Sequence, residues 1–184
     1  MKSALAIVAS GDRRLMLRVN RWQPPRWFRV WMVYATRGGD GWLWYALGLG
    51  MLAFGGEARL EALASSVAAV GSGIGLFLWL KKRIGRQRPC ALAACCWHTL
   101  LPPDQFSFPS GHTITAFAVA ASVMHYYPTL APELWFCAAS VAVSRVVLGM
   151  HFVSDVVAGA GIGGLLGTLS VWTITAATAF RWSV

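Results

Sequence analysis

Five long apolar stretches constrain this chain more than any other feature. They cover residues 41–55, 62–80, 110–127, 134–149 and 152–180. A membrane-spanning helix needs about 20 mostly apolar residues, within a range of about 17–25, and a helix satisfies its own backbone hydrogen bonds in lipid. The sequence therefore predicts an all-α integral membrane protein, a compact bundle of about five transmembrane helices.

Composition narrows the choice of environment and partner. The chain has 184 residues, of which 57% are hydrophobic and 12% charged, whereas a soluble domain has about 25% charged residues. This excludes a disordered chain and an ordinary water-soluble globule. The net charge of +9 would favour nucleic acid in a soluble protein. Because the stretches between the basic clusters are too apolar for water, we expect anionic membrane lipids and a phosphorylated substrate as partners, and no nucleic acid.

The N-terminal segment, residues 1–40, contains eight of the basic residues. Leu15, Val19 and Trp22 recur at helical spacing, which predicts an amphipathic helix in the membrane interface with arginines reaching the lipid headgroups. We therefore divide the chain into a basic amphipathic interfacial segment, 1–40, and a transmembrane domain, 41–184.

Charge also distinguishes the two ends of the predicted bundle. Alternation of five spans places residues 1–40, the loop 81–109 and the turn near 149–151 at one end, called face A here, and the loops 56–61 and 128–133 at the other, face B. Face A carries 14 of the 16 Lys and Arg residues. Since positively charged loops stay in the cytoplasm, the sequence predicts that face A is cytoplasmic.

Three polar clusters fall on face A, and one of them pairs a histidine with a carboxylate. His151 and Asp155 are four residues apart, so on a helix they would lie within contact range. A carboxylate on one imidazole nitrogen fixes the tautomer and raises the basicity of the other nitrogen, as a nucleophile or general base requires. The alternative is a structural His–Asp pair.

A second cluster, Pro109-Ser110-Gly111-His112, opens an apolar stretch. Ser110 is a favourable N-cap residue, and Gly111 lets a ligand approach the backbone. Free N–H groups at a helix start bind anions. His112 would need a phosphate or carboxylate beside it to act as a proton donor, because the helix dipole disfavours the imidazolium. The alternative is a helix cap with an incidental histidine.

The remaining cluster runs from Lys81 to Pro89 and supplies cations. Lys81 and Arg88 suit a phosphate, since arginine gives a bidentate grip and lysine a point charge. The alternative is positive charge that flanks a span, and we interpret Lys82, Arg83 and Arg86 in that way.

Together the clusters read Lys-x6-Arg-Pro from Lys81, Pro-Ser-Gly-His from Pro109 and Ser-Arg-x5-His-x3-Asp from Ser144. In this order they resemble the motifs of the type 2 phosphatidic acid phosphatase superfamily. The resemblance covers residues 81–155 by motif and implies a multi-pass protein of the bacterial inner membrane. Larger bacterial members have six spans, one more than this chain is expected to have.

The resemblance implies a phosphate-binding role for five positions. Lys81, Arg88 and Arg145 would hold the phosphoryl oxygens, and Ser110 with the backbone N–H of Gly111 would complete the cradle. Phosphoryl transfer depends mainly on positioning and charge stabilisation, which three cations can supply. The sequence has no carboxylate cluster of the kind that holds Mg²⁺, so we expect turnover without a metal or another cofactor.

For the chemical steps the resemblance implies three catalytic residues. His151 would attack phosphorus and form a phosphohistidine, Asp155 would orient it, and His112 would protonate the leaving oxygen and later activate water. The implied activity is hydrolysis of a lipid phosphomonoester or diphosphate, such as phosphatidylglycerophosphate, phosphatidate, or undecaprenyl phosphate or diphosphate. Two alternatives remain: a lipid phosphotransferase, and a catalytically inactive lipid-binding membrane protein. The sequence carries no signal for an oligomeric state.

Two further patterns have simpler interpretations. Gly159, Gly163 and Gly167 continue the four-residue spacing of the last motif, and we interpret them as a stripe against which a neighbouring helix packs. His98 and His125 lie outside the three motifs and are expected to have no catalytic role.

Overall fold

Helices form most of the backbone in the computed structural model, which describes residues 2–92 and 105–181. In chain order they are α1 Lys2–Arg21, α2 Arg26–Arg37, the π-helical turn η1 Gly38–Trp42, α3 Leu43–Phe54, η2 Gly56–Ala58, α4 Arg59–Ile84, α5 Pro89–Leu92, α6 Gly111–Tyr126, η3 Pro128–Leu130, α7 Ala131–Val147 and α8 Val153–Arg181. Within the described ranges the extended backbone amounts to one isolated bridge, between Gln87 and Phe106. The predicted all-α class is confirmed.

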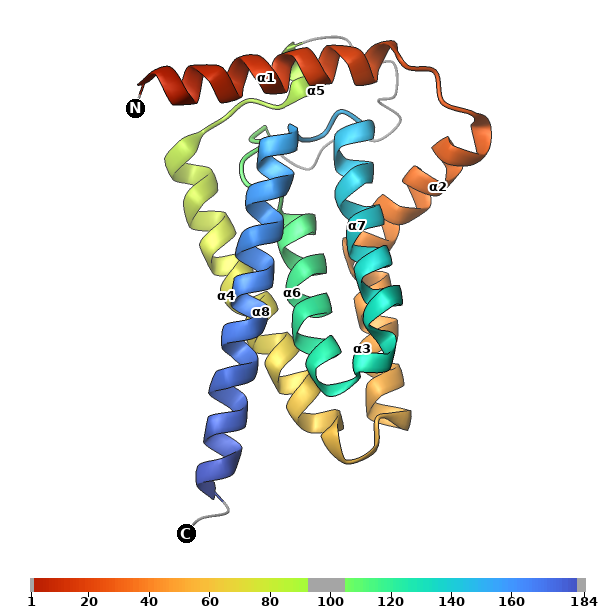
Figure 1. Ribbon diagram of the computed structural model, residues 1–184, viewed down its shortest axis with the longest axis vertical. Coiled ribbons are helices and arrows are strands. Elements are labelled where there is room, and N and C mark those ends of the chain that lie inside the picture. The colour runs from red at the N-terminus through yellow and green to blue at the C-terminus, as the bar shows by residue number, and fades with distance from the viewer. Residues whose placement is uncertain (1, 93–104, 182–184) are drawn as a thin grey trace.

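The five predicted apolar stretches correspond to α3, α4, α6, α7 and α8 (Figure 1). Three segments of the described chain are long and apolar enough to cross a membrane: Gly56–Ile84, Pro128–Val147 and Val153–Phe180. Helices α3 and α6, with 12 and 16 residues, are shorter than a typical span. The count of five spans therefore stays a prediction.

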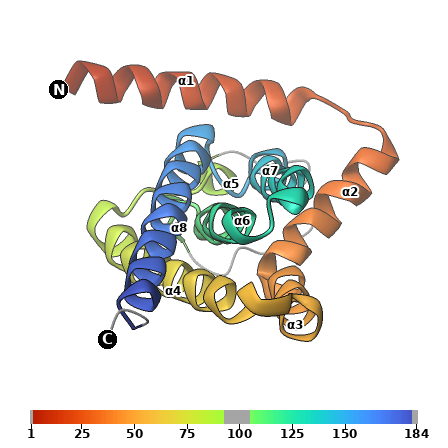
Figure 2. The same ribbon diagram turned by 60° about the horizontal axis from the view of Figure 1, so that its bottom comes forward.

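Helix α6 lies at the centre of the bundle, between α4, α7 and α8 (Figures 1 and 2). The predicted glycine stripe lies on α8 and forms the contact between α8 and α6. A Cβ atom on Gly159 would lie 2.9 Å from the carbonyl oxygen of Ser110, and one on Gly167 would lie 2.7 Å from that of Ala118. Gly163 faces α6 in the same way, against the carbonyl of Ile114. The packing role of the stripe is confirmed, because only glycine permits so close an approach.

The ends of the helices alternate as the sequence predicts. The C-terminal end of α4, the start of α6, the end of α7 and the start of α8 lie at one end of the bundle (Figure 1). At the opposite end, the hydroxyl of Tyr127 donates to the carbonyl of Gly55 over 2.8 Å, and the hydroxyls of Tyr126 and Ser65 lie 2.9 Å apart. All three motifs therefore belong to face A.

Helix α1 crosses face A, roughly perpendicular to the bundle (Figures 1 and 2). Asp12 and Met16 are buried, whereas Arg13, Arg14 and Leu15 are exposed. Helix α1 thus presents one side to the bundle and its basic side outward.

Helix α2 instead packs against α7, where the rings of Trp31 and Phe136 stack with centroids 5.7 Å apart. A kink joins α2 to α3: Gly41 has a φ of 130°, which a residue with a side chain rarely adopts. The residue before it, Asp40, therefore lies at the bend, beside the start of α6.

Candidate active site

Residues from separate elements meet at face A, under α1. Arg88 precedes α5, Arg145 lies in the last turns of α7, and His151 lies in the turn between α7 and α8. Backbone bonds shape that turn, since the carbonyl of Arg145 accepts hydrogen bonds from the N–H groups of Met150 and His151, each over 3.0 Å. The chain reversal thus brings His151 back beside the cations.

The two ring nitrogens of His151 have different partners. Nδ1 lies 2.6 Å from the carbonyl oxygen of Ser107, and Nε2 lies 3.2 Å from Nη1 of Arg88. Because a carbonyl oxygen only accepts hydrogen bonds, Nδ1 carries the proton and Nε2 offers its lone pair toward Arg88. An unprotonated nitrogen that faces a cation is the arrangement that attack on a bound phosphate needs.

Burial keeps this imidazole neutral. His151 is 3% exposed, and burial lowers its pKa to about 4; the positive charges of Arg145 and Arg88 act in the same direction, while the Asp155 carboxylate raises the pKa. At neutral pH the ring is therefore uncharged, which is the nucleophilic form.

Asp155 lies next to His151 without being its direct hydrogen-bond partner. Its Oδ2 atom is 3.8 Å from Nδ1 of His151 and accepts a hydrogen bond from the N–H of Phe152 over 2.8 Å. His151 precedes the first residue of α8, so the pair is not stacked within one helix as the spacing predicts. Ser107, which no motif identifies, supplies the direct contact. No residue pattern could have predicted this contact, because the backbone carbonyl that makes it is present in every residue type.

The three predicted phosphate-binding cations are all buried, Lys81 at 8%, Arg88 at 2% and Arg145 at 2% exposure. Arg88 donates from Nη1 to the carbonyl of Met150 over 2.8 Å. Arg145 donates from Nη1 to Oγ1 of Thr36 over 2.6 Å, and Nζ of Lys81 lies 4.3 Å above the ring of Phe77. Burying cations is costly, so three buried cations favour an anionic ligand.

Ser110 and Gly111 form the start of α6 as predicted. Ser110 is fully buried and occupies the N-cap position, although its side chain makes no cap hydrogen bond. Its Oγ accepts a hydrogen bond from Thr113 over 2.9 Å, and its N–H donates to the carbonyl of Asp155 over 3.1 Å. That last bond ties the start of α6 directly to α8.

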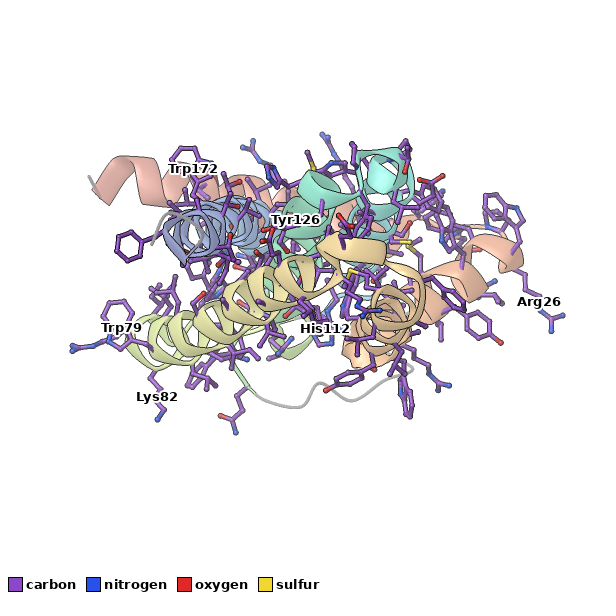
Figure 3. The ribbon with its side chains drawn as sticks, turned by 90° about the horizontal axis from the view of Figure 1, so that it is seen from below. Arg26, Trp79, Lys82, His112, Tyr126 and Trp172 are labelled. Carbon is purple, nitrogen blue, oxygen red and sulfur yellow. The ribbon has the colours of Figure 1, made fainter. Side chains whose placement is uncertain are left out.

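His112 finds the carboxylate that a proton donor at a helix start requires. Its Nε2 lies 2.6 Å from Oδ1 of Asp40 in η1, and its side chain is 22% exposed. Both residues, with Gly111, line a cavity of about 350 Å³ between α4, α6 and η1. Figure 3 shows His112 among the helices, whereas Trp79, Lys82 and Arg26 project outward from the periphery of the protein.

Sequence reasoning missed Asp40, although a signal was available. It is a single carboxylate at the edge of an apolar stretch, and ionisable residues in such places are expensive unless they have a partner and a use.

One prediction was wrong, the interpretation of Arg86 as a positive charge that only flanks a membrane span. Its Nη1 donates to Oδ1 of Asp155 over 2.6 Å and to Oγ of Ser154 over 2.7 Å. Lys82 and Arg83 are exposed at the end of α4, as expected of flanking residues. His98 lies outside the described residues, and His125 lies at the far end of α6 beside Tyr126.

The fold and site define a class: a helical membrane protein in which a buried histidine faces Arg88, with the positive charge of Arg145 close by. Within residues 2–92 and 105–181, no group of three or more His, Cys, Asp or Glu side chains is arranged to hold a metal ion.

The particular family follows from comparison. The model of the PAP2 superfamily matches residues 61–179, and the chain belongs to that superfamily. The matched segment contains all three motifs, so the resemblance seen in the sequence is confirmed.

Similar proteins include several named phosphatases. A lipid A 1-phosphatase of Porphyromonas gingivalis is 33% identical over 134 residues, which cover 67% of this chain and 27% of that protein. A decaprenylphosphoryl-5-phosphoribose phosphatase of Mycobacterium tuberculosis is 33% identical over 129 residues, 70% of this chain and 69% of that protein. The chain thus spans about a quarter of the first relative and about two thirds of the second.

Two solved structures share the fold. The crystal structure of LpxE from Aquifex aeolicus has a TM-score of 0.73 and 27% identity, over 86% of this chain and 93% of that one. A transmembrane PAP2-type phosphatidylglycerolphosphate phosphatase from Bacillus subtilis has a TM-score of 0.68 and 27% identity, over 97% and 88%. The likeness extends over nearly the whole described bundle, so this chain is a membrane protein of the same architecture.

Proposed function

We propose that this chain is a membrane lipid phosphatase that hydrolyses a phosphomonoester or diphosphate through a phosphohistidine at His151. The observation that carries the proposal is the geometry of His151, whose Nδ1 lies 2.6 Å from the carbonyl oxygen of Ser107 while its Nε2 faces Nη1 of Arg88 over 3.2 Å. A phosphoryl group bound by Arg88, Arg145 and Lys81 would place its phosphorus within reach of that nitrogen.

In the first step, Nε2 of His151 attacks phosphorus while the bond to the lipid oxygen breaks. Arg88 turns its donor from Nε2 to a phosphoryl oxygen. The imidazole gains a positive charge, which the Ser107 carbonyl and the Asp155 carboxylate stabilise. His112 starts as an imidazolium, held through Nε2–H by the Asp40 carboxylate, and gives its Nδ1 proton to the leaving oxygen, which leaves it a neutral imidazole.

In the second step the phosphohistidine is hydrolysed. His112 takes a proton from water through Nδ1, the water oxygen bonds to phosphorus, and the bond between phosphorus and Nε2 breaks. Inorganic phosphate leaves and both histidines return to their starting states. The protein's own cations balance the phosphoryl charge throughout, so we expect the reaction to proceed without a metal ion.

A second cavity supports a lipid substrate. It has a volume of about 530 Å³ and an almost wholly apolar wall, formed mainly by α3 and α4. Ile74 of α4 lines both this cavity and the one that contains His112. The hydrocarbon chain of a lipid would lie between α3 and α4 while its phosphate reaches the cations.

We also propose that the active site faces the cytoplasm from the inner membrane, with residues 1–40 as its interfacial segment. The test uses Lys82→Cys on face A and Glu57→Cys on face B, both exposed, in a chain whose four native cysteines are replaced by alanine. An impermeant maleimide applied to intact cells should label Glu57→Cys alone. Labelling of Lys82→Cys alone would place the site outside.

The activity is tested by phosphate release from a panel of lipids by the purified protein, with and without EDTA. The panel contains phosphatidate, phosphatidylglycerophosphate, undecaprenyl diphosphate, lipid A and decaprenylphosphoryl-5-phosphoribose. We expect release from at least one lipid, no effect of EDTA, and no release by His151→Ala, with His125→Ala as the active control.

The same assay separates the alternatives. A phosphorylated acceptor lipid in place of free phosphate would identify a phosphotransferase. Binding of every lipid without turnover would identify an inactive binding protein and would overturn the proposal.

A further inference from the structure

Helix α1 carries one carboxylate among its arginines, and that carboxylate faces the protein. Asp12 is 7% exposed, whereas its neighbours Arg13 and Arg14 are exposed. A carboxylate in a basic interfacial helix would ordinarily lie in water near its own arginines. Its burial against the bundle therefore calls for an explanation outside α1.

Asp12 joins α1 to the start of α8. Its Oδ2 accepts a hydrogen bond from Nη2 of Arg86 over 2.7 Å and another from the hydroxyl of Ser154. Its Oδ1 accepts from the backbone N–H of Ser154 over 3.2 Å. These charge-assisted bonds link Asp12 to residues 74 and 142 positions away in the sequence, so they arise only from the tertiary fold.

Arg86 connects Asp12 to the site. While Nη2 binds Asp12, Nη1 binds Oδ1 of Asp155 over 2.6 Å, and the guanidinium lies 4.1 Å above the ring of Phe152. Asp155 is completely buried, whereas the Arg86 side chain is 25% exposed. Asp155 therefore depends on a cation that is itself partly open to solvent. Asp12 restrains that cation from its other side.

We propose that Asp12 is a positioning residue of the active site, which acts through Arg86 and Asp155 on His151. In this arrangement α1 is part of the support of the nucleophile, in addition to any contact with lipid headgroups. The inference rests on the proposed function, since Asp155 matters here through its stabilisation of the charge that develops on His151.

The first test compares Asp12→Asn with the wild type, using a short-chain lipid phosphate in detergent micelles. We expect kcat to fall about tenfold with little change in KM, a loss of the size seen when a supporting residue lets a catalytic group shift. Asp12→Glu should recover part of the activity. Arg14→Gln, on the outward side of the same helix, is the matched control and should keep its kcat.

The second test asks whether Asp12 acts through Arg86. In an Arg86→Gln background, Asp12→Asn should cause no further loss of kcat, because residues in one network are not additive. A wild-type kcat in Asp12→Asn, or the same loss in both backgrounds, would overturn the inference. A loss in vesicles but not in micelles would also overturn it, since that result identifies α1 as a membrane anchor only.

A readout without turnover keeps the inference separate from the proposed function. In ¹⁵N-histidine-labelled protein, the Nδ1 resonance of His151 should shift in Asp12→Asn and stay in place in Arg14→Gln. If the wild type releases no phosphate from any substrate, the proposed function is wrong. If the His151 resonance is unchanged in Asp12→Asn, the positioning role is wrong, whether or not the wild type is active.

Discussion

His151 and His112 lie in the same site but are held in different ways. His151 is almost fully buried and donates to a backbone carbonyl, that of Ser107. His112 is partly exposed and binds the side chain of Asp40, which is itself 54% exposed and comes from a kink between two helices. A backbone partner fixes one orientation and one tautomer, whereas a side-chain pair at the edge of a cavity can move. The difference suits the roles proposed for them, a fixed nucleophile and a proton carrier that serves two steps.

The largest expected loss of activity comes from replacing each histidine in turn, which tests this comparison directly. His151→Ala should abolish phosphate release, by at least about 10³-fold, whatever the leaving group. His112→Ala should lose about 10²–10⁴-fold in kcat with a lipid alcohol as leaving group. With p-nitrophenyl phosphate, whose leaving group needs no proton, the first step should stay fast and give a pre-steady-state burst of nitrophenol, although the later hydrolysis is slowed. Absence of that burst in His112→Ala would contradict the proposed role of His112 as the acid.

The carboxylates extend the comparison to smaller effects. Asp40→Asn keeps the shape of the side chain but removes the charge that holds His112, so we expect a loss of about tenfold to hundredfold with the lipid. With p-nitrophenyl phosphate the first step should be nearly normal, as a pre-steady-state burst would show. Glu57→Gln, at the opposite end of the bundle, is the control. An Asp40→Asn variant as active as the wild type would show that His112 needs no partner.

The protonation state of His151 can be measured directly. Since burial lowers its pKa to about 4, the ring should stay neutral as the pH falls through 6.5, the ordinary value for histidine, and protonate only near pH 4. In ¹⁵N-histidine spectra, Nδ1 should carry the proton and Nε2 should not, with His151→Asn used to assign the signals. Titration near pH 6.5, or a proton on Nε2, would contradict a nucleophile fixed by Ser107.

The smallest expected effect concerns the helix contact that carries both histidines. In Gly159→Ala the new methyl would lie 2.9 Å from the carbonyl of Ser110, so the start of α6 must move away from α8. We expect a lower melting temperature in detergent and a several-fold loss of activity. Gly161→Ala, which meets nothing within 4 Å, is the matched control, and its helix should be slightly more stable. Identical behaviour of the two variants would show that the contact tolerates displacement.

Much of this architecture follows from local patterns in the sequence. The glycine stripe from Gly159 to Gly167 predicts that a neighbouring helix packs closely against it, because small residues four apart share one helix face, and the structure identifies that neighbour as α6. The three motifs predict which side chains gather, since alternation of the spans sends all of them to one end. The number of membrane spans does not follow from the apolar stretches alone, because α3 and α6 are shorter than the stretches that contain them.

The contacts of other site residues follow no local pattern. Asp12 is a lone carboxylate in a basic segment and Arg86 is one of several basic residues after α4, and nothing in their spacing predicts that they pair. Asp40 carries a signal as a lone carboxylate at the edge of an apolar stretch, but its contact with His112 depends on the kink at Gly41. These contacts arise from packing between segments far apart in the chain.

The sequence by itself determined the helical membrane class, the superfamily and the set of motif residues, because apolar length and fixed spacing are local properties of a chain. Only the tertiary structure decided which atom of His151 faces the cations, that Ser107 rather than Asp155 holds its ring, and that α1 reaches the site through Asp12 and Arg86. Hydrogen-bond partners are set by distances between separate segments, and those distances exist only once the helices have packed.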